Sequence, residues 1–350
     1  MRFFSYRNKL RFLRFAAITG SILAVTAILV IGVIAYLDRY IVYDHNGANL
    51  DVNWKEHSAA NGAVKHSDIN AEIAYVDSGD DVAIGSTRKV SGYYITSEML
   101  KDIPSVQETL SSGAFYAVMI DVKDIYGFFY YPSGVSEART ASSVDVHAVA
   151  ELIQTLDDAG AYLIARIPAF ADQRYCLNHV ELGLPLSSGA LWADDDNCYW
   201  MDPGDPAVIN YLETICTELQ TLGFREVVLD GFRFPDTEAI VYDESERSRE
   251  DVLIEAATVL QADMSMMDLK ISFGLDNEQV LPMPLTEGRL YFEMDDGASI
   301  HSLVARQEAY VVTPDVQIVF LAESRDTRFE EYGHLSPAIQ SALPAMEDDE

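Results

Sequence analysis

The residues best placed to do chemistry are charged side chains that follow short apolar runs: Asp121, Asp124, Arg166, Asp230, Asp276, Glu293 and Asp295. Two carboxyl groups on either side of a glycosidic bond can hydrolyse it. One donates a proton, and the other acts as the nucleophile or as the base for water. Asp230 is the strongest candidate for this pair, because the run Val227–Leu229 would deliver it to the end of a strand.

Asp230 and Glu293 are the predicted catalytic pair. Arg233 lies three residues after Asp230, and a nearby guanidinium favours the ionised carboxylate that a nucleophile or base requires. Glu293 follows Tyr291 and Phe292, and apolar surroundings would raise its pKa towards that of a proton donor. The alternative is a purely structural ion pair between Asp230 and Arg233, with Glu293 simply solvated. The reserve partners are Asp276 and Glu278.

Further polar and aromatic residues are expected to bind the substrate. The segment 121–124 (DVKD) would place alternate side chains in one opening, with Lys123 binding hydroxyls or a carboxylate. A polar network between strands explains this segment equally well. Trp192 and Trp200 lie in a long predicted loop, where flat rings can stack on sugars. Packing of that loop against its own domain accounts for them equally well.

No metal or other cofactor is predicted. The segment 194–197 (DDDN) lacks the D-x-D-x-D-G spacing of a calcium loop, so we interpret it as a solvated turn. The histidines form no HExxH motif, and no Cys/His ligand spacing occurs. Cys176 and Cys198 lie 22 residues apart in a loop-like region, and the sequence leaves open whether they form a disulfide bond.

The elements that would position these side chains alternate between strands and helices. The predicted strands are 90–95, 115–122, 161–167, 226–229, 269–273, 289–292 and 316–321, and the predicted helices are 98–110, 144–156, 207–222 and 251–262. This alternation implies right-handed crossovers and a parallel sheet. No G-x-G-x-x-G follows the first strand, and only a barrel brings the strand ends to one mouth. The predicted fold class is therefore α/β, a TIM-type (β/α) barrel, incomplete at its C-terminal end because no eighth strand is evident.

Three segments together resemble the bacterial family of putative glycosyl hydrolase domains, which is related to the glycoside hydrolase barrels. They are AVMIDVKDIYGFFYYPS (117–133), AGAYLIARIPAFAD (159–172), and the stretch from ALWADDDNCYWMDPGDPAVINYL to LGFREVVLDGFRFP (190–235). The resemblance covers roughly residues 89–235 and implies a TIM-type barrel with a carbohydrate-associated role. It implies that the family's polar positions are Asp121, Lys123, Asp124, Arg166, Asp202, Asp230 and Arg233.

Two departures from the family pattern concern the predicted site. Gly231 stands where the family has an aromatic residue beside the aspartate. The family's PMVYPSHY strand and loop has no counterpart, and residues 289–296 read RLYFEMDD instead.

The charge distribution predicts a membrane protein. The chain has 24 Lys and Arg against 56 Asp and Glu, and this acidity disfavours nucleic acid as a partner. Five bases and no acid precede residue 15, and residues 16–37 form a run of 22 without a charge, long enough to span a bilayer. A cleaved signal peptide or a buried helix fits this run less well. By the positive-inside rule the N-terminus is cytoplasmic.

The predicted organisation is a basic cytoplasmic segment, a transmembrane signal-anchor, an extracytoplasmic tether, a glycoside-hydrolase-like barrel and an acidic tail, at 1–15, 16–37, 38–88, 89–335 and 336–350. The expected function is that of a membrane-anchored extracytoplasmic glycoside hydrolase acting on a polysaccharide or cell-wall glycan. One alternative is a non-catalytic glycan-binding or envelope scaffold module on the same fold. Another is a structural ectodomain for a protein partner.

Overall fold

The computed structural model describes residues 41–44, 47–50, 88–113, 115–136, 138–245, 247–281, 283–285, 287–294, 297, 299–323 and 326–339. The chain divides into two compact units, Met1–Ile69 and Asn70–Glu350. Within the first, β1 (Ile41–Asp44) and β2 (Gly47–Leu50) form an antiparallel hairpin inside the segment predicted as a tether. The predicted membrane helix at 16–37 lies outside the described residues. No helix in the described ranges is long and apolar enough to span a bilayer.

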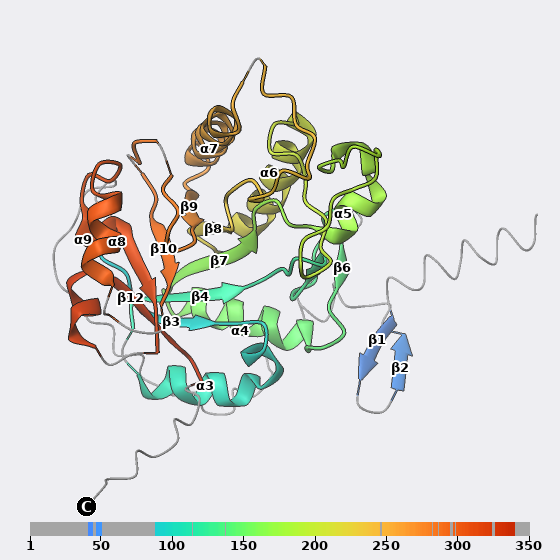
Figure 1. Cartoon of the computed structure of the whole chain (residues 1–350). Coiled ribbons are helices and arrows are strands. Elements are labelled where there is room, and N and C mark those ends of the chain that lie inside the picture. Colours follow the sequence, from blue (N-terminus) through green and yellow to red (C-terminus); the bar gives the residue numbers. More distant parts are fainter. Residues whose placement is uncertain are drawn as a thin grey trace, which may run out of the picture. The chain divides into compact units, whose positions relative to one another are not determined.

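Eight parallel strands of the second unit form a closed barrel (Figure 1). Each strand pairs with the next along the chain, and the last pairs with the first, which closes the ring. This confirms the predicted TIM-type barrel. The strands are β3 (Ser91–Ile95), β4 (Ala117–Asp121), β7 (Tyr162–Pro168), β8 (Glu226–Asp230), β9 (Lys270–Gly274), β10 (Leu290–Glu293), β11 (Ile318–Leu321) and β12 (Gly333–Pro337).

The barrel is complete, and the expectation of a missing eighth strand was wrong. Strand β12 pairs with β11 on one side and with β3 on the other. Its sequence, GHLSP, has only one large apolar residue, Leu335, whereas buried parallel strands usually read as continuous apolar runs. Strand β12 spans the predicted boundary between the barrel (89–335) and the acidic tail (336–350). Residues 340–350 of the predicted tail lie outside the described residues.

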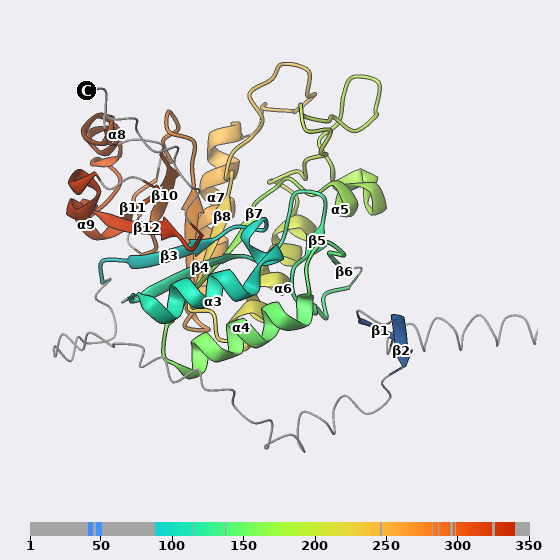
Figure 2. The same ribbon diagram turned by 90° about the horizontal axis from the view of Figure 1, so that it is seen from below.

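Helices cover the outside of the barrel, and Figure 2 shows α3 and α4 side by side along it. The helices and helical turns of the second unit are η2 (Met99–Lys101), α3 (Ile103–Ser112), α4 (Val146–Asp158), α5 (Gln173–Asn178), η3 (Val180–Leu182), α6 (Pro206–Thr221), α7 (Arg249–Ser265), α8 (Ile300–Gln307), α9 (Pro314–Gln317) and η4 (Thr327–Glu331). A small strand pair, β5 (Phe128–Phe129) and β6 (Arg139–Thr140), lies in the loop after β4. The helix predicted at 98–110 is divided, because Asp102 caps α3 and Pro104 stands in its first turn.

Alternation along the strands separates two groups of buried residues. One fills the barrel and includes Ala117, Ile164, Val228, Val319 and Leu335. The other packs the strands against the helices, as Leu229 of β8 does in the cluster that also holds Leu212 and Ile215 of α6. Since side chains alternate between the two faces of a strand, every second residue of each strand points into the barrel.

Candidate active site

The barrel interior carries four charged side chains at the carboxyl ends of its strands. Asp121 on β4, Arg166 on β7, Asp230 on β8 and Glu293 on β10 share the alternation of the buried interior residues Met119, Ile164, Val228 and Tyr291. Barrel enzymes keep their active sites at this end. The strand-end arrangement predicted from the sequence is therefore present for these four residues.

Arg166 is the centre of an ion-pair cluster at the mouth. Its Nε lies 2.7 Å from Oδ1 of Asp121, and its Nη2 donates to Oδ2 of the same carboxylate at 3.2 Å. The remaining Nη1 donates to Oε1 of Glu293. Two parallel N–H contacts from one guanidinium fix the orientation of the Asp121 carboxylate and favour its ionised form. Arg166 thus links β4 to β10 across the opening.

Asp230 differs from the other carboxylates of this cluster. It lines the cavity at the mouth, and no described side chain lies within ion-pair or hydrogen-bond distance of its carboxyl group. Asp230 is exposed at the cavity, yet many protein atoms lie near its carboxyl group and partly desolvate it. Desolvation raises the pKa of Asp230, Arg166 opposes this rise, and Glu293 adds to it. Asp230 is therefore the carboxyl group best suited to hold a proton.

Local backbone geometry presents Asp230 to the cavity. The next residue, Gly231, has a φ of 63°, a left-handed conformation that favours glycine, and its carbonyl accepts the N–H of Arg233 at 2.8 Å. This gives a physical reason for the glycine where the family has an aromatic residue. Gly274, the partner of Asp230 on β9, leaves space for the carboxyl group.

The sequence prediction gave Asp230 and Glu293 the wrong surroundings. Arg233, expected beside Asp230, has its Nε 3.0 Å from Oδ2 of Asp276. The Glu293 side chain is 68% exposed and ion-paired with Arg166, so its surroundings are not apolar. The two predicted catalytic carboxyls do meet at one opening, but the environment of a proton donor belongs to Asp230.

The mouth encloses a cavity of about 320 Å³. Its wall comes from the ends of β7, β8, β10 and β11 and from the loops after β4, β7, β8 and β9, including the long loop between α5 and α6. The lining residues are Ile125, Pro168, Ala171, Asp194, Asp196, Trp200, Asp230, Gly231, Arg233, Leu275, Asp276, Asn277, Tyr291, Glu293 and Leu321. A cavity with convergent polar groups at this face of a TIM-type barrel is the default candidate for a ligand site.

Trp200 lines the cavity but offers little ring surface to a ligand. The guanidinium of Arg233 lies 5.2 Å from the centre of its ring, and Nε1 donates to Oδ2 of Asp194 at 2.8 Å. Trp192 meets it edge to face at 6.4 Å and does not line the cavity. Trp200 is 6% exposed. The tryptophans predicted to stack on sugars therefore pack mainly within their own loop and against Arg233.

Of the residues predicted to bind substrate, Trp200 and Arg233 line the cavity, whereas Asp121 and Arg166 lie in the ion-pair cluster beside it. Three others, Lys123, Asp124 and Asp202, have structural contacts elsewhere. Lys123 is buried, and its Nζ lies 2.7 Å from Oδ2 of Asp172, which also caps α5. Asp124 accepts the backbone N–H groups of Tyr126 and Phe128 and so holds a turn. The Oδ1 of Asp202 accepts the N–H of Gly204 in the loop before α6, and desolvation raises its pKa. Each of these side chains supports local structure.

Several residues of the mouth were not predicted as site residues. Asp194 and Asp196, interpreted as part of a solvated turn, line the cavity. Tyr94 on β3 points into the barrel near Glu293, and desolvation with the neighbouring carboxylates raises its pKa to about 12. Strand alternation from β3 was the available signal for Tyr94. Asp295 lies outside the described residues, and the reserve residue Glu278 is exposed and does not line the cavity.

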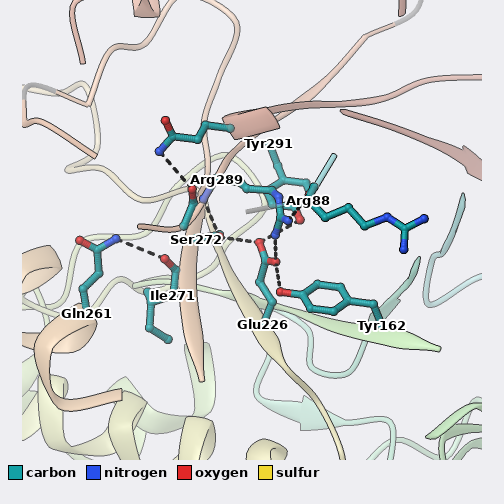
Figure 3. A network of polar contacts seen from close by, with 10 residues as sticks. Arg88, Tyr162, Glu226, Gln261, Ile271, Ser272, Arg289 and Tyr291 are labelled. Carbon is teal, nitrogen blue, oxygen red and sulfur yellow. Dashed lines mark hydrogen bonds and ion pairs between the residues drawn. The ribbon is translucent and has the colours of Figure 1, made fainter. Parts of the chain in front are cut away.

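A second polar cluster closes the opposite end of the barrel (Figure 3). Glu226, at the start of β8, is fully buried and ion-paired with Arg289. Its carboxylate also accepts the hydroxyl groups of Tyr162 at 2.8 Å and Tyr291 at 2.9 Å, and that of Ser272. These partners satisfy the buried charge, so this cluster is structural.

The three cysteines form no disulfide bond with one another. Cys176, Cys198 and Cys216 are buried free thiols, and burial raises the pKa of each. No group of three or more metal-ligating side chains in the described ranges is arranged to hold an ion.

Fold and site together define an α/β barrel with carboxylates at its mouth. The family model for "Putative glycosyl hydrolase domain" matches residues 91–276, and the chain belongs to this family. The match includes Asp121, Arg166 and Asp230, whereas Glu293 lies beyond it. No curated protein has a matching sequence.

Solved structures with similar coordinates include three bacterial proteins. A hypothetical protein from Ruminiclostridium thermocellum is 21% identical, with 52% of this chain and 96% of that chain covered and a TM-score of 0.46. The glycoside hydrolase domain of PelA from Pseudomonas aeruginosa is 16% identical, with 72% and 95% covered and a TM-score of 0.45. A chitobiase from Flavobacterium johnsoniae is 10% identical, with 67% and 38% covered and a TM-score of 0.44.

Proposed function

We propose that this protein is a glycoside hydrolase that cleaves a polysaccharide at the mouth of its barrel. The observation that carries the proposal is the contrast between Asp230 and Glu293 in one opening. Asp230 faces the cavity without an ion-pair partner and with a raised pKa, whereas Glu293 is exposed and paired with Arg166. Two carboxyl groups in contrasting environments are what acid–base cleavage of a glycosidic bond requires.

In the proposed reaction Asp230 is the proton donor and Glu293 is the base. Asp230 gives its proton to the glycosidic oxygen as the bond from that oxygen to the anomeric carbon breaks. Glu293 takes a proton from the water whose oxygen bonds to the anomeric carbon. Solvent then returns a proton to Asp230 and removes one from Glu293. Arg166 holds Glu293 in place, and its other two contacts hold Asp121.

Inversion of configuration is the proposed stereochemical outcome. Strand β9 lies between β8 and β10, and with about 4.8 Å between neighbouring strands the two backbones are roughly 9–10 Å apart. Inverting enzymes place their carboxyl groups roughly 6.5–9.5 Å apart to admit a water molecule, and retaining enzymes roughly 5–5.5 Å apart. Because β9 separates the strands that carry Asp230 and Glu293, the proposal assigns the wider separation, with a water molecule activated by Glu293; product stereochemistry determined by NMR tests it.

The proposed location is the outer side of a cell membrane. This part of the proposal rests on the charge-free run at 16–37 and on the five bases before it. Protease treatment of intact cells, followed by immunodetection of the C-terminal domain, tests it. Accessibility of the domain only after lysis would contradict it.

The function is tested by reducing-sugar release from a panel of cell-wall and storage polysaccharides by the full-length chain. Asp230→Asn keeps the shape of the side chain and is expected to abolish release, whereas the exposed Glu278→Gln is its matched control. Release that survives Asp230→Asn contradicts the proposed proton donor. Binding of a polysaccharide without release identifies a glycan-binding module on the same fold instead.

A further inference from the structure

The residue after Asp230 is a glycine, and an Asp–Gly bond is open to a reaction within the chain. The backbone nitrogen of the glycine can attack the side-chain carboxyl carbon and close a five-membered succinimide ring. Glycine favours this step because it has no Cβ to crowd the attacking nitrogen. The sequence holds two such pairs, Asp230–Gly231 and Asp296–Gly297, and the first lies at the barrel mouth.

The backbone at Gly231 leaves its nitrogen accessible. Gly231 follows the last residue of β8 with a left-handed φ of 63°, and a Cβ at this position would meet no atom within 4 Å. In a regular ladder the Gly274 carbonyl would accept the N–H of Gly231, but here it accepts that of Phe232 at 3.3 Å. The attacking nitrogen is therefore neither crowded nor held by that carbonyl.

The carboxyl group of Asp230 is the other reacting partner. No described side chain lies within ion-pair or hydrogen-bond distance of it, and desolvation by nearby protein atoms raises its pKa. A neutral carboxyl group can release its hydroxyl as water, whereas a carboxylate has no such leaving group. The hydrogen bond that opposes ring closure runs from the Ala169 N–H to the Asp230 carbonyl at 2.8 Å, because this carbonyl shares a peptide plane with the Gly231 nitrogen.

We propose that Asp230 and Gly231 form a site of spontaneous succinimide formation, through which the folded protein converts Asp230 to isoaspartate as it ages. The bond from the Gly231 nitrogen to Cγ of Asp230 forms, and the bond from Cγ to its hydroxyl oxygen breaks. That hydroxyl leaves as water with the proton of the Gly231 N–H. Water then opens the ring at one of its two carbonyls, which gives back aspartate or gives isoaspartate, and nothing is oxidised or reduced.

The modification removes the Asp230 carboxyl group from its present position. Isoaspartate carries the main chain through the former side chain, so its free carboxyl group hangs directly from Cα. A displacement of about 1 Å in a reacting group lowers the rate about a hundredfold. Each modified molecule is therefore expected to be inactive, and this effect on activity is the part of the inference that rests on the proposed function.

The test ages the full-length protein beside a free peptide of the same sequence. Both are kept at pH 6 and 37 °C and then treated with trypsin in mildly acidic buffer. The peptide 226–233 (EVVLDGFR) is analysed by mass spectrometry for loss of one water and for isoaspartate. The informative variant is Gly231→Asn, because asparagine tolerates a left-handed backbone but crowds the nitrogen. The matched control is Gly189→Asn, since Gly189 also has a left-handed φ, of 81°, and open surroundings but follows a serine.

Dehydrated and isoaspartyl forms at position 230 are expected to accumulate in the folded wild-type protein. Gly231→Asn should lower their yield about tenfold, because a Cβ then crowds the attack, and Gly189→Asn should leave it unchanged. Asp230→Asn gives a second reading, since its amide loses ammonia to the same ring and should yield aspartate and isoaspartate at position 230.

Two results overturn the proposal. One is the absence of these products from the folded proteins while the free peptide forms them, since the barrel would then keep the two groups apart. The other is an equal yield of modified Asp230 in the Gly231→Asn and wild-type proteins.

The outcomes separate this inference from the proposed function. If fresh protein releases reducing sugar and Asp230 stays unmodified on ageing, the hydrolase remains and the modification site is wrong. If isoaspartate accumulates at position 230 but fresh protein cleaves no polysaccharide, the modification site remains and hydrolysis is wrong. When both hold, sugar release falls in proportion to the fraction of modified Asp230.

Discussion

Gly274 on β9 leaves the space that the carboxyl group of Asp230 occupies on the neighbouring strand. The two residues are register partners. A Cβ atom at position 274 would lie 2.2 Å from Oδ1 of Asp230 and 3.0 Å from its Cα. Atoms in proteins do not approach so closely without displacement, so the missing side chain at 274 determines where this carboxyl group lies.

Gly274→Ala is expected to lower kcat about a hundredfold, because a displacement of the proton donor of about 1 Å has effects of that size. Stability should fall by about 1–3 kcal/mol from overpacking. Steady-state kinetics and urea denaturation check both expectations, with Gly134→Ala on the barrel exterior as the control. A wild-type kcat in the Gly274→Ala protein would contradict the argument that activity depends on the present position of the Asp230 carboxyl group.

Asp230→Asn is expected to stabilise the protein at neutral pH while it abolishes activity. Desolvation raises the pKa of Asp230, so the folded state holds this proton more tightly than the unfolded state. Its ionisation therefore costs stability as the pH rises from the usual aspartate pKa of about 3.9 through the raised value. The variant lacks this penalty and should be the more stable protein, by an amount that solvent screening at the exposed Asp230 reduces. Denaturation at pH 8 and pH 5 should show the larger gain at pH 8, and a loss at pH 8 would count against the argument.

Arg166→Gln leaves the carboxylates of Asp121 and Glu293 without their cation. We expect a loss of about 3 kcal/mol in the free energy of unfolding and little remaining activity. The double variant Asp121→Asn, Arg166→Gln should recover part of the stability but none of the activity, because Glu293 still lacks its positioning contact. Recovery of both properties would reduce Arg166 to a structural role.

Glu226→Gln tests the cluster at the closed end of the barrel. The change leaves the buried Arg289 guanidinium without its counter-charge, and stability should fall by about 3–5 kcal/mol. Below the unfolding temperature, kcat should stay at the wild-type value, since Glu226 lies at the opposite end from the mouth. The exposed Glu287→Gln is the surface control. A reduced kcat in fully folded Glu226→Gln protein would mean that the two ends are coupled.

Much of the barrel follows from the sequence because its strands are buried on both faces. The runs around Met119, Ile164, Val228 and Val319 are continuous and apolar, and each lies within a strand. Strand β12 was not predicted, because its sequence GHLSP has little hydrophobicity of its own and is buried by the neighbouring strands. The amino-terminal anchor lies outside the described residues and stays a prediction.

The sequence predicted which residues lie at the strand ends of the site, but it did not predict which side chains contact one another. Position in a strand identified Asp121, Arg166, Asp230 and Glu293 at one opening. Sequence proximity suggested the wrong partner for Arg233, since its side chain reaches Asp276 in the loop after β9. The pairing of Lys123 with Asp172 likewise depends on the fold rather than on spacing.

Closure of the ring by β12 has a consequence for how the chain acquires its structure. Strand β3 gains its second neighbour only when His334 pairs beside Ser91, close to the end of the barrel sequence. A chain synthesised from its N-terminus therefore holds two unpaired sheet edges until almost the whole domain has emerged, and contacts of such long sequence separation form slowly. The mouth, and with it any chemistry there, is complete only once β12 has emerged and paired with β3. Until then the exposed β3 edge is the point at which a chaperone or a second nascent chain competes with β12.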